Sequence, residues 1–269
     1  MNELNASKQF HDEGYFIAKN IIEEKEILEI FQNIFKIYSN KNLKSSLGDG
    51  KDYQKEIFHE EMTRFRLENP DIFSEIYDSC QSSCSLTKLV AKNEILEIAS
   101  ELLSCNKIEL SQTGNMIRMD VPLDTRNKTA WHQEIAFVRN EGLVLWIPLV
   151  GITPEIGPLK ILEKSHLEGE ITIERNDLNQ YSTSRVSKSE IPKTILQKYN
   201  EKSIEIELGD ALFFDNTLIH SSGTNTSKKI RFSCQTRFFN SLSNGFAPFR
   251  INEVYNPYSM KRLNRKIYD

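Results

Sequence analysis

The stretch that decides the fold is "ELGDALFFDNTLIHSSGTNTSKKIRFSCQTRFF", at residues 207–239. It contains two runs, "DALFFD" and "KIRFSCQTRFF", whose aromatic and aliphatic residues are typical of β-strands. The Gly-Asp pair opening the first run, and the Ser, Gly and Asn residues between the runs, are typical of turns. Two strands joined by a short irregular link predict a β-rich region in this part of the chain.

Five further runs of the same kind precede this stretch. They are "KIELSQT" (107–113), "GNMIRMDVP" (114–122), "LVLWIPLV" (143–150), "GPLKILEKSH" (157–166) and "SIEIEL" (203–208). Many short strands separated mostly by Gly, Pro, Asn or Asp indicate a sandwich or barrel such as a jelly roll. The polar interval 168–203 is long for a connection, which predicts a lid or a decorated surface loop.

The first 105 residues favour helices. Apolar residues recur at helical spacing over residues 20–38, and Asn20 followed by Glu23 predicts an N-cap with a capping box. Residues 40–53 predict a loop and residues 70–103 two helices. Since no linker composition interrupts the chain, we expect one domain over 1–269. It would comprise helical support at 1–105, a jelly-roll core at 106–240 and a C-terminal extension at 241–269.

Charge and hydropathy exclude several classes of function. The net charge of −4 provides no large positive field for nucleic acid or anionic lipid. The longest apolar run, at 143–150, is far shorter than the roughly 20 residues of a membrane span. The N-terminus lacks the pattern of a secretory signal, so we expect a cytoplasmic protein. The four cysteines lack the spacing of a zinc site, which predicts free thiols.

The stretch "TAWHQEIAF" at 129–137 carries the first chemical signal. On a strand, His132 and Glu134 would share one face while Gln133 points the other way. His220 follows 88 residues after His132, and Arg231 follows 11 residues after His220. Two imidazoles and one carboxylate can hold Fe(II) and leave coordination positions open. An arginine nearby could bind a distal carboxylate as a two-pronged fork.

In combination and in order, these segments resemble the phytanoyl-CoA dioxygenase family of Fe(II)/2-oxoglutarate oxygenases. The resemblance covers most of the chain and rests on "FHDEGYFIAKNIIEEKEI" (10–27), "WHQE" (131–134), "LWIPLVGITPEIGPLKILEKSHLEG" (145–169) and 209–238. One departure is that the family normally has aspartate where this chain has Glu134. Glutamate keeps the charge and the ligand type, and its reach is longer by about 1.5 Å, one C–C bond.

The resemblance implies a mainly β fold with flanking helices: a double-stranded β-helix, of the jelly-roll or cupin type, with N-terminal helices packed on one sheet. It implies Fe(II) held by His132, Glu134 and His220, with 2-oxoglutarate and O₂ as cosubstrates. Arg231 would bind the distal carboxylate of 2-oxoglutarate. Contacts to 2-oxoglutarate are also expected from Ser222, which shares the face of His220, and from Trp146. No catalytic residue is expected beyond the metal ligands.

Alternation along the strands suggests residues for the substrate. Arg231, Ser233, Gln235 and Arg237 share one face of a strand, and Arg118 alternates with Asp120 on another. We expect Arg118, Gln235 and Arg237 to meet a polar or anionic substrate, although an internal Arg–Asp pair is an alternative. His166 is expected to cap a loop and not to bind metal, and His11 and His59 are expected on the surface.

The resemblance implies an oxygenase that hydroxylates an aliphatic C–H bond and releases succinate and CO₂. The polar interval 168–203 and the arginine-bearing strands favour a polar small molecule as its substrate. Two alternatives remain: a non-catalytic jelly roll that binds a metabolite, and a metal-dependent cupin isomerase or epimerase. Arg231 argues against the cupin, whose site needs no anchor for a second carboxylate. We expect neither a nucleic-acid nor a membrane partner, and the pattern leaves the oligomeric state and the substrate's identity open.

Overall fold

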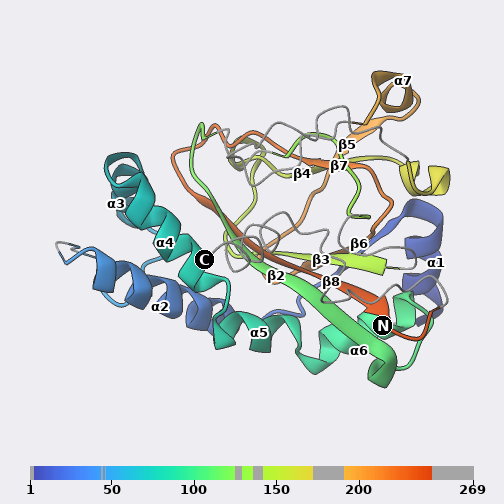
Figure 1. The fold of residues 1–269 in the computed structure, drawn as a ribbon, viewed down its shortest axis with the longest axis horizontal. Coiled ribbons are helices and arrows are strands. Elements are labelled where there is room, and N and C mark those ends of the chain that lie inside the picture. Colours follow the sequence, from blue (N-terminus) through green and yellow to red (C-terminus); the bar gives the residue numbers. More distant parts are fainter. Residues whose placement is uncertain are drawn as a thin grey trace, which may run out of the picture.

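The computed structural model describes residues 3–43, 45, 47–124, 129–135, 142–171 and 191–243. Its strands form two antiparallel sheets, one above the other (Figure 1). The larger sheet has the order β1-β6-β3-β8-β2, with bounds Tyr15–Ala18, Ala211–Asp215, Gly142–Pro148, Arg231–Asn240 and Leu110–Asp120. The smaller has the order β5-β4-β7, with bounds Glu201–Ser203, Leu159–Leu162 and His220–Ser222. Two facing antiparallel sheets confirm the predicted jelly roll.

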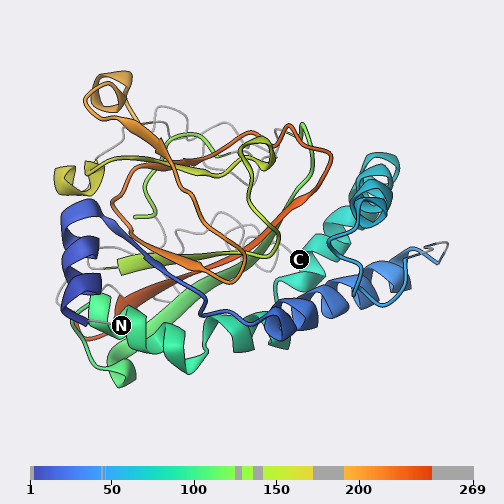
Figure 2. The ribbon, with the colours of Figure 1, turned by 180° about the vertical axis from the view of Figure 1, so that it is seen from behind.

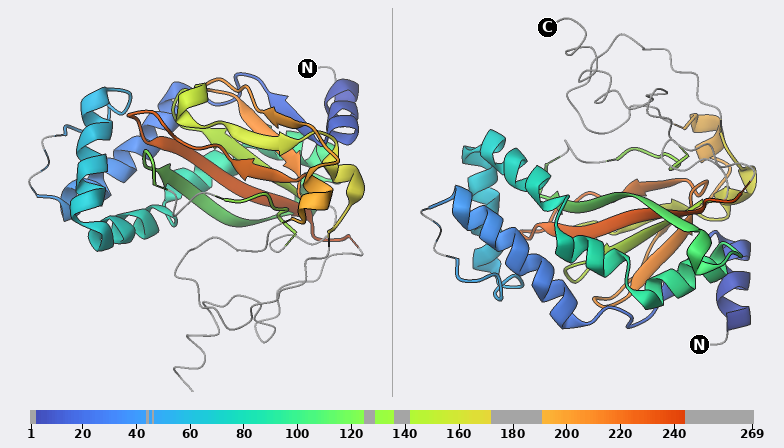
Figure 3. Two further views of the ribbon diagram at one scale, coloured as in Figure 1. Left: turned by 90° about the horizontal axis from the view of Figure 1, so that it is seen from above. Right: turned by 60° about the horizontal axis from the view of Figure 1, so that its bottom comes forward.

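Helices of the N-terminal half pack along the outer face of the larger sheet and at its ends (Figures 2 and 3). They are α1 (Glu3–Glu13), α2 (Glu24–Lys41), α3 (Glu56–Glu68), α4 (Pro70–Cys80), α5 (Cys84–Val90) and α6 (Asn93–Leu102). One hydrophobic cluster joins their apolar faces to the outer face of the sheet, as the prediction of helical support requires. The connections carry η1 (Lys107–Glu109), η2 (Pro154–Ile156), η3 (Ser165–Glu168) and α7 (Lys193–Leu196). Within the described ranges, none of the helices is long and apolar enough to cross a membrane.

The pleat of the central strands divides their apolar residues between two cores. On β3, Leu143 and Leu145 join the cluster shared with the helices, whereas Val144 and Trp146 join a second cluster. That second cluster also contains Leu159 and other residues of the smaller sheet, so it lies between the sheets. Both faces of β3 are buried, which explains why its sequence is a continuous apolar run and does not alternate.

Strands β2 and β8 have a different inner face. Phe232, Cys234 and Phe238 of β8 pack in the helical core. Because side chains alternate along a strand, Arg231 and Arg237 point to the opposite side, between the sheets. In the register of the pair, Asp120 of β2 lies opposite Arg231. One half of the space between the sheets is therefore apolar, and the other half carries buried charges.

The helical half corrects three predictions. The helix predicted from residue 20 begins later: Asn20 has φ +54° and donates its amide to Asp210 Oδ1 at 3.0 Å. Glu23 is the N-cap instead, and its amide donates to Glu26 Oε2 at 2.9 Å. Residues 70–103 form three helices, not two, because Ser83 caps a new helix, α5. Helix α3 was not predicted, although its apolar residues recur at helical spacing.

Other differences concern strands and connections. The two runs at 107–113 and 114–122 share one strand, β2 at Leu110–Asp120, because the glycine between them lies in a β-bulge and not in a turn. Lys107–Glu109, at the start of the first run, form η1. Strand β5 lies at Glu201–Ser203, before most of the predicted run at 203–208. The four cysteines are free thiols, as predicted. Most of the polar interval, at 172–190, and residues 244–269 of the C-terminal extension lie outside the described residues.

Candidate metal centre

The two histidines of the predicted triad lie on adjacent backbone segments. The amide of His132 donates to the carbonyl of His220 at 3.0 Å, and the amide of His220 donates back at 3.0 Å. Each ring places Nδ1 beside a carbonyl, Ala130 O at 2.8 Å and Leu218 O at 2.9 Å. A carbonyl only accepts, so Nδ1 carries the hydrogen on both rings. Both Nε2 atoms therefore keep a lone pair for a metal.

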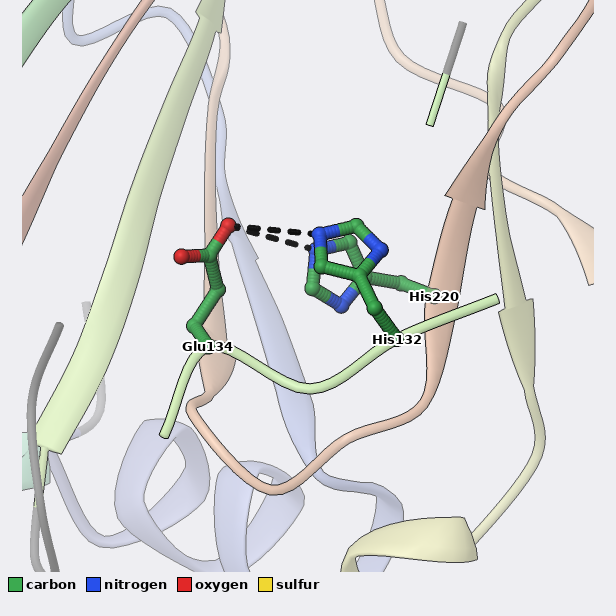
Figure 4. A group of neighbouring side chains, drawn as sticks. All are labelled: His132, Glu134 and His220. Carbon is green, nitrogen blue, oxygen red and sulfur yellow. Dashed lines mark ion pairs between the residues drawn. The ribbon is translucent and has the colours of Figure 1, made fainter. Parts of the chain in front are cut away.

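Glu134 completes the group. Its Oε1 lies 3.5 Å from His132 Nε2 and 3.7 Å from His220 Nε2, as the dashed lines in Figure 4 show. One potential ligand atom from each residue lies within 4.8 Å of the others. The amide of Glu134 donates to Asn216 O at 2.8 Å, which fixes the backbone of this segment to the residue that follows β6. Two imidazoles and one carboxylate around one point are the donor set that non-haem Fe(II) takes.

The electrostatics keep these residues in the forms that bind metal. Burial alone would raise the pKa of Glu134, but the Arg237 guanidinium holds that pKa well below its usual range. Burial and the neighbouring His132 lower the pKa of His220. The carboxyl is therefore ionised and His220 is neutral near pH 7, the protonation states that metal coordination requires.

Gln133 points away from this centre, as the pleat predicted. Its amide nitrogen donates to Gly169 O at 2.8 Å and Thr217 O at 2.6 Å. Its amide oxygen accepts from the backbone nitrogen of Ile171 at 2.9 Å. Three hydrogen bonds from one buried side chain tie the metal-binding segment to two connections of the fold. This residue therefore holds the segment in place without touching the metal site.

The triad lies in the wall of a pocket between the two sheets. Nearly all of the predicted cosubstrate and substrate residues line the same pocket; its lining is Arg118, Thr129, His132, Glu134, Trp146, Leu159, Phe214, His220, Ser222, Arg231 and Gln235. The exception is Arg237. Sequence reasoning missed Thr129, Leu159 and Phe214. For Phe214 a signal existed, since it shares one face of the alternating strand with Leu212.

Arg231 is buried at one end of this pocket and paired with Asp120. Its Nε and Nη2 donate to Asp120 Oδ2 at 3.1 and 2.8 Å, and its Nη1 donates to the carbonyl of Gly157. Arg118 donates to the same carboxylate, at 3.2 and 3.0 Å. Burial alone would raise the pKa of Asp120, but the two arginines keep it below its usual value. Two arginines around one carboxylate concentrate positive charge in this part of the site, which suits a further carboxylate.

Ser222 lies beside the metal-binding histidine on β7. Its hydroxyl is 2.6 Å from Thr129 Oγ1, and its amide donates to the same oxygen at 3.1 Å. The two hydroxyls thus form a pair in the pocket wall, between the segment that carries His132 and the strand that carries His220. A hydroxyl pair of this kind can present either a donor or an acceptor to a bound molecule.

The remaining histidines are accounted for. His166 lies away from the triad, and its Nε2 donates to the carbonyl of His11 at 2.9 Å, so it ties a loop to helix α1. His11 is exposed, as predicted. The prediction for His59 was wrong: its side chain is fully buried under β8, and its Nδ1 accepts from the backbone nitrogen of Ile230 at 3.1 Å.

Comparisons with known proteins agree with this geometry. No curated protein sequence matches the chain significantly, but the profile of the family described as phytanoyl-CoA dioxygenase (PhyH) matches residues 10–233. The chain belongs to the phytanoyl-CoA dioxygenase family. With the complete triad, this makes it an iron- and 2-oxoglutarate-dependent oxygenase.

Solved structures share the fold of this family member. The epimerase SnoN, solved in complex with Fe³⁺, alpha ketoglutarate and nogalamycin RO, aligns with a TM-score of 0.58 at 16% identity, over 88% of this chain and 83% of that one. The carbocyclase SnoK from nogalamycin biosynthesis gives 0.57 at 18% identity, over 88% and 83%. EctD from S. alaskensis, with bound Fe, gives 0.56 at 14% identity, over 87% and 75%. At these identities the likeness concerns the fold.

Proposed function

We propose that this oxygenase hydroxylates an aliphatic C–H bond of a polar small molecule, with release of succinate and CO₂. The observation that carries the proposal is the composition of the pocket, which the triad lines together with a buried arginine, Arg231, and two further polar residues, Arg118 and Gln235. When bound, iron and 2-oxoglutarate supply O₂ activation coupled to decarboxylation. The protein's own residues bind, orient and shield these groups.

The cosubstrate would be held by residues at the Asp120 end of the pocket. Arg231 would bind the distal carboxylate of 2-oxoglutarate through a guanidinium that Asp120 already holds in place by its Nε and Nη2. Ser222 would donate its hydroxyl to the same group. Trp146, on the neighbouring strand β3, would form the apolar wall along the carbon chain.

The apolar half of the space between the sheets would exclude water. Trp146, Leu159 and Phe214 belong to one hydrophobic cluster and also line the pocket beside the metal ligands. A dry, rigid wall of this kind limits side reactions of reactive species. Arg118 and Gln235 lie on β2 and β8, the two strands that follow β3 in the order of the larger sheet, and would bind polar groups of the substrate.

The complete triad and the buried arginine argue against a non-catalytic binding protein, which has no need of either. Epimerisation is the runner-up reaction, because it would use the same triad and the same anchor. A metal-dependent cupin without 2-oxoglutarate would leave Arg231 without a role.

The test is a screen of full-length protein with Fe(II), ascorbate and 2-oxoglutarate against a panel of polar metabolites, with Glu134→Ala as the inactive control. The expected result is succinate release stimulated by one substrate class, with a product heavier by one oxygen atom. A product of unchanged mass would establish epimerisation instead. Binding of a panel member without any succinate release would overturn the oxidation.

A further inference from the structure

One buried arginine of β8 stands apart from the pocket. The side chain of Arg237 is 2% exposed, and Glu134 is 5% exposed. Arg237 Nη2 donates to both carboxylate oxygens of Glu134, at 3.0 Å to Oε1 and 2.9 Å to Oε2. Arg237 Nε donates to Oε2 at 3.2 Å. The two residues are 103 positions apart in the chain. This fork is therefore made by the fold and is directed at a metal ligand.

The contact gives the two carboxylate oxygens different surroundings. Oε1 faces the ring nitrogens of His132 and His220, at 3.5 and 3.7 Å. Oε2 accepts two hydrogen bonds from the guanidinium on the other side. A planar fork fixes the plane of a carboxylate as well as its position. Oε1 also accepts from Nη2, at 3.0 Å, so Arg237 holds both oxygens and thereby fixes the direction in which Oε1 points.

A glutamate needs this support more than an aspartate does. Its side chain has one more rotatable bond, so more conformational entropy is lost when its carboxylate is held at one point. Its reach is also longer by about 1.5 Å, one C–C bond. Arg237 holds the carboxylate at the end of the Glu134 side chain, which is the part whose rotation the backbone restricts least.

Space for the arginine comes from a bulge in β2. The register with β8 shifts between Thr113 and Met116, and Gly114 within the shift has φ +68°. A Cβ atom at Gly114 would lie 3.0 Å from Arg237 Nη1, and the carbonyl of Gly114 accepts from that nitrogen at 2.9 Å. Glycine adopts positive φ without a steric penalty. The bulge therefore both admits the guanidinium and supplies an acceptor for it.

We propose that Arg237 is a positioning residue that orients Glu134 as an iron ligand, and that it is matched to glutamate in place of the family's aspartate. This role replaces the substrate contact predicted from the sequence. It rests on the proposed function in one respect, that Glu134 binds iron. Because the fork is tied to the longer side chain, the effects of changing Arg237 and Glu134 are coupled.

The expected effects are specific. Arg237→Gln should weaken metal binding about 10- to 100-fold, the usual loss for residues that orient a metal ligand. The metal affinity of Arg237→Lys should lie between those of the wild type and Arg237→Gln, because lysine keeps the charge but not the planar fork. Glu134→Asp should also weaken binding. In the Arg237→Gln background, Glu134→Asp should reduce the metal affinity less, because the fork that requires the longer side chain is gone.

The experiment measures Co(II) binding to full-length protein by calorimetry, together with the ligand-field absorption of bound Co(II). His132→Ala tests the site itself, and Arg66→Gln is the matched control. Arg66 is also a buried arginine paired with a carboxylate, Asp124 at 3.6 Å, but it lies on α3. The expected result is weaker binding and an altered spectrum in the Arg237 and Glu134→Asp variants, loss of binding in His132→Ala and wild-type behaviour in Arg66→Gln. The effects in the double variant should be non-additive.

Two failures are distinguishable. If His132→Ala binds Co(II) as the wild type does, the metal site of the proposed function is wrong. If His132→Ala loses binding while both Arg237 variants keep the wild-type affinity and spectrum, only the positioning role is overturned. Circular dichroism checks that each variant is folded. Should Arg237→Gln fail to fold, the comparison of Arg237→Lys with wild type decides, because an unchanged spectrum there contradicts the role of the fork.

Discussion

The two faces of β8 show two ways in which this protein buries polar groups. On the inner face, Arg231 and Arg237 are each paired with a carboxylate, Asp120 and Glu134. On the outer face, among the phenylalanines that meet the helices, the ring of His59 packs against Phe232 at 6.0 Å between centroids.

The two faces differ in how the unfavourable burial of an ionisable group is offset. On the inner face, opposite charges keep the pKa of Asp120 and that of Glu134 below their usual values, so the groups remain charged. On the outer face, burial first, and the nearby Lys229 second, lower the pKa of His59 to about 4, so the ring stays neutral. Buried groups are either matched or neutralised. The inner face thus keeps its buried groups charged in pairs, and the outer face keeps its buried imidazole neutral.

The largest effect is expected where an inner-face pair is broken. Glu134→Ala should abolish metal binding and turnover, because one of three ligands is lost. It should also lower the free energy of unfolding by about 3–5 kcal/mol, because Arg237 keeps its charge without its partner. Metal content and chemical unfolding measure the two effects. Glu134→Gln, which restores an acceptor but not the charge, should recover part of the stability and little of the metal binding. A metal-loaded, active Ala variant would contradict the ligand role.

Breaking the second inner-face pair, Arg231 with Asp120, should weaken 2-oxoglutarate binding and leave metal binding unchanged. Arg231→Ala should weaken 2-oxoglutarate binding by about 2–5 kcal/mol, or roughly 30- to several-thousand-fold. Arg231→Lys should raise the KM for 2-oxoglutarate strongly, because lysine offers a point charge in place of a fork. Titration with 2-oxoglutarate, with metal content checked in parallel, measures both. Unchanged affinity in the Ala variant would mean that Arg231 serves only Asp120.

The outer face should respond to acid. The pKa of His59 is about 4 when folded and about 6.5 when unfolded, so the unfolded state takes up the proton first. The contribution of neutral His59 to the free energy of unfolding is therefore intact above about pH 6.5 and is lost as the pH falls toward 4. About 2 kcal/mol of it is lost between pH 7 and pH 5.

His59→Asn isolates this contribution. Its side-chain oxygen can still accept from the backbone nitrogen of Ile230 but does not titrate. The loss of stability between pH 7 and pH 5 should be smaller in this variant by about 2 kcal/mol, measured by urea unfolding at both values. Equal losses in the two proteins would show that the ring is not held neutral by the fold.

The inner face could be predicted because its signal is local. Alternation along 231–237 places the two arginines on one side of the strand whatever the partner strand is. The order of His132, Glu134, His220 and Arg231 predicted the pocket, and four of the five remaining cosubstrate and substrate residues line it. Patterns of this kind depend on spacing within one segment or on the order of segments. Both can be read from the sequence without knowing how the segments pack.

Partners across the fold could not be predicted in the same way. Arg237 and Glu134 meet only because a bulge at Gly114 makes room, and neither register nor bulge is visible in an alternating pattern. His59 was assigned to the surface because its helix, α3, was not recognised. The spacing of Phe58, Met62 and Phe65 was a sufficient signal for that helix. It would have placed His59 beside a buried face.

The smallest expected effect distinguishes two roles for Ser222, the hydroxyl that faces the inner side of β8 from the smaller sheet. Ser222→Ala removes its hydrogen bond to Thr129, worth about 1 kcal/mol. If the hydroxyl also contacts 2-oxoglutarate, the KM should rise about 5-fold. Thr129→Val serves as the control, because it breaks the same pair but leaves the serine hydroxyl in place. A rise in KM for Ser222→Ala in both the wild-type and Thr129→Val backgrounds supports the cosubstrate contact. If the rise vanishes in the Thr129→Val background, the serine acts only through its partner, and the inner face binds 2-oxoglutarate without it.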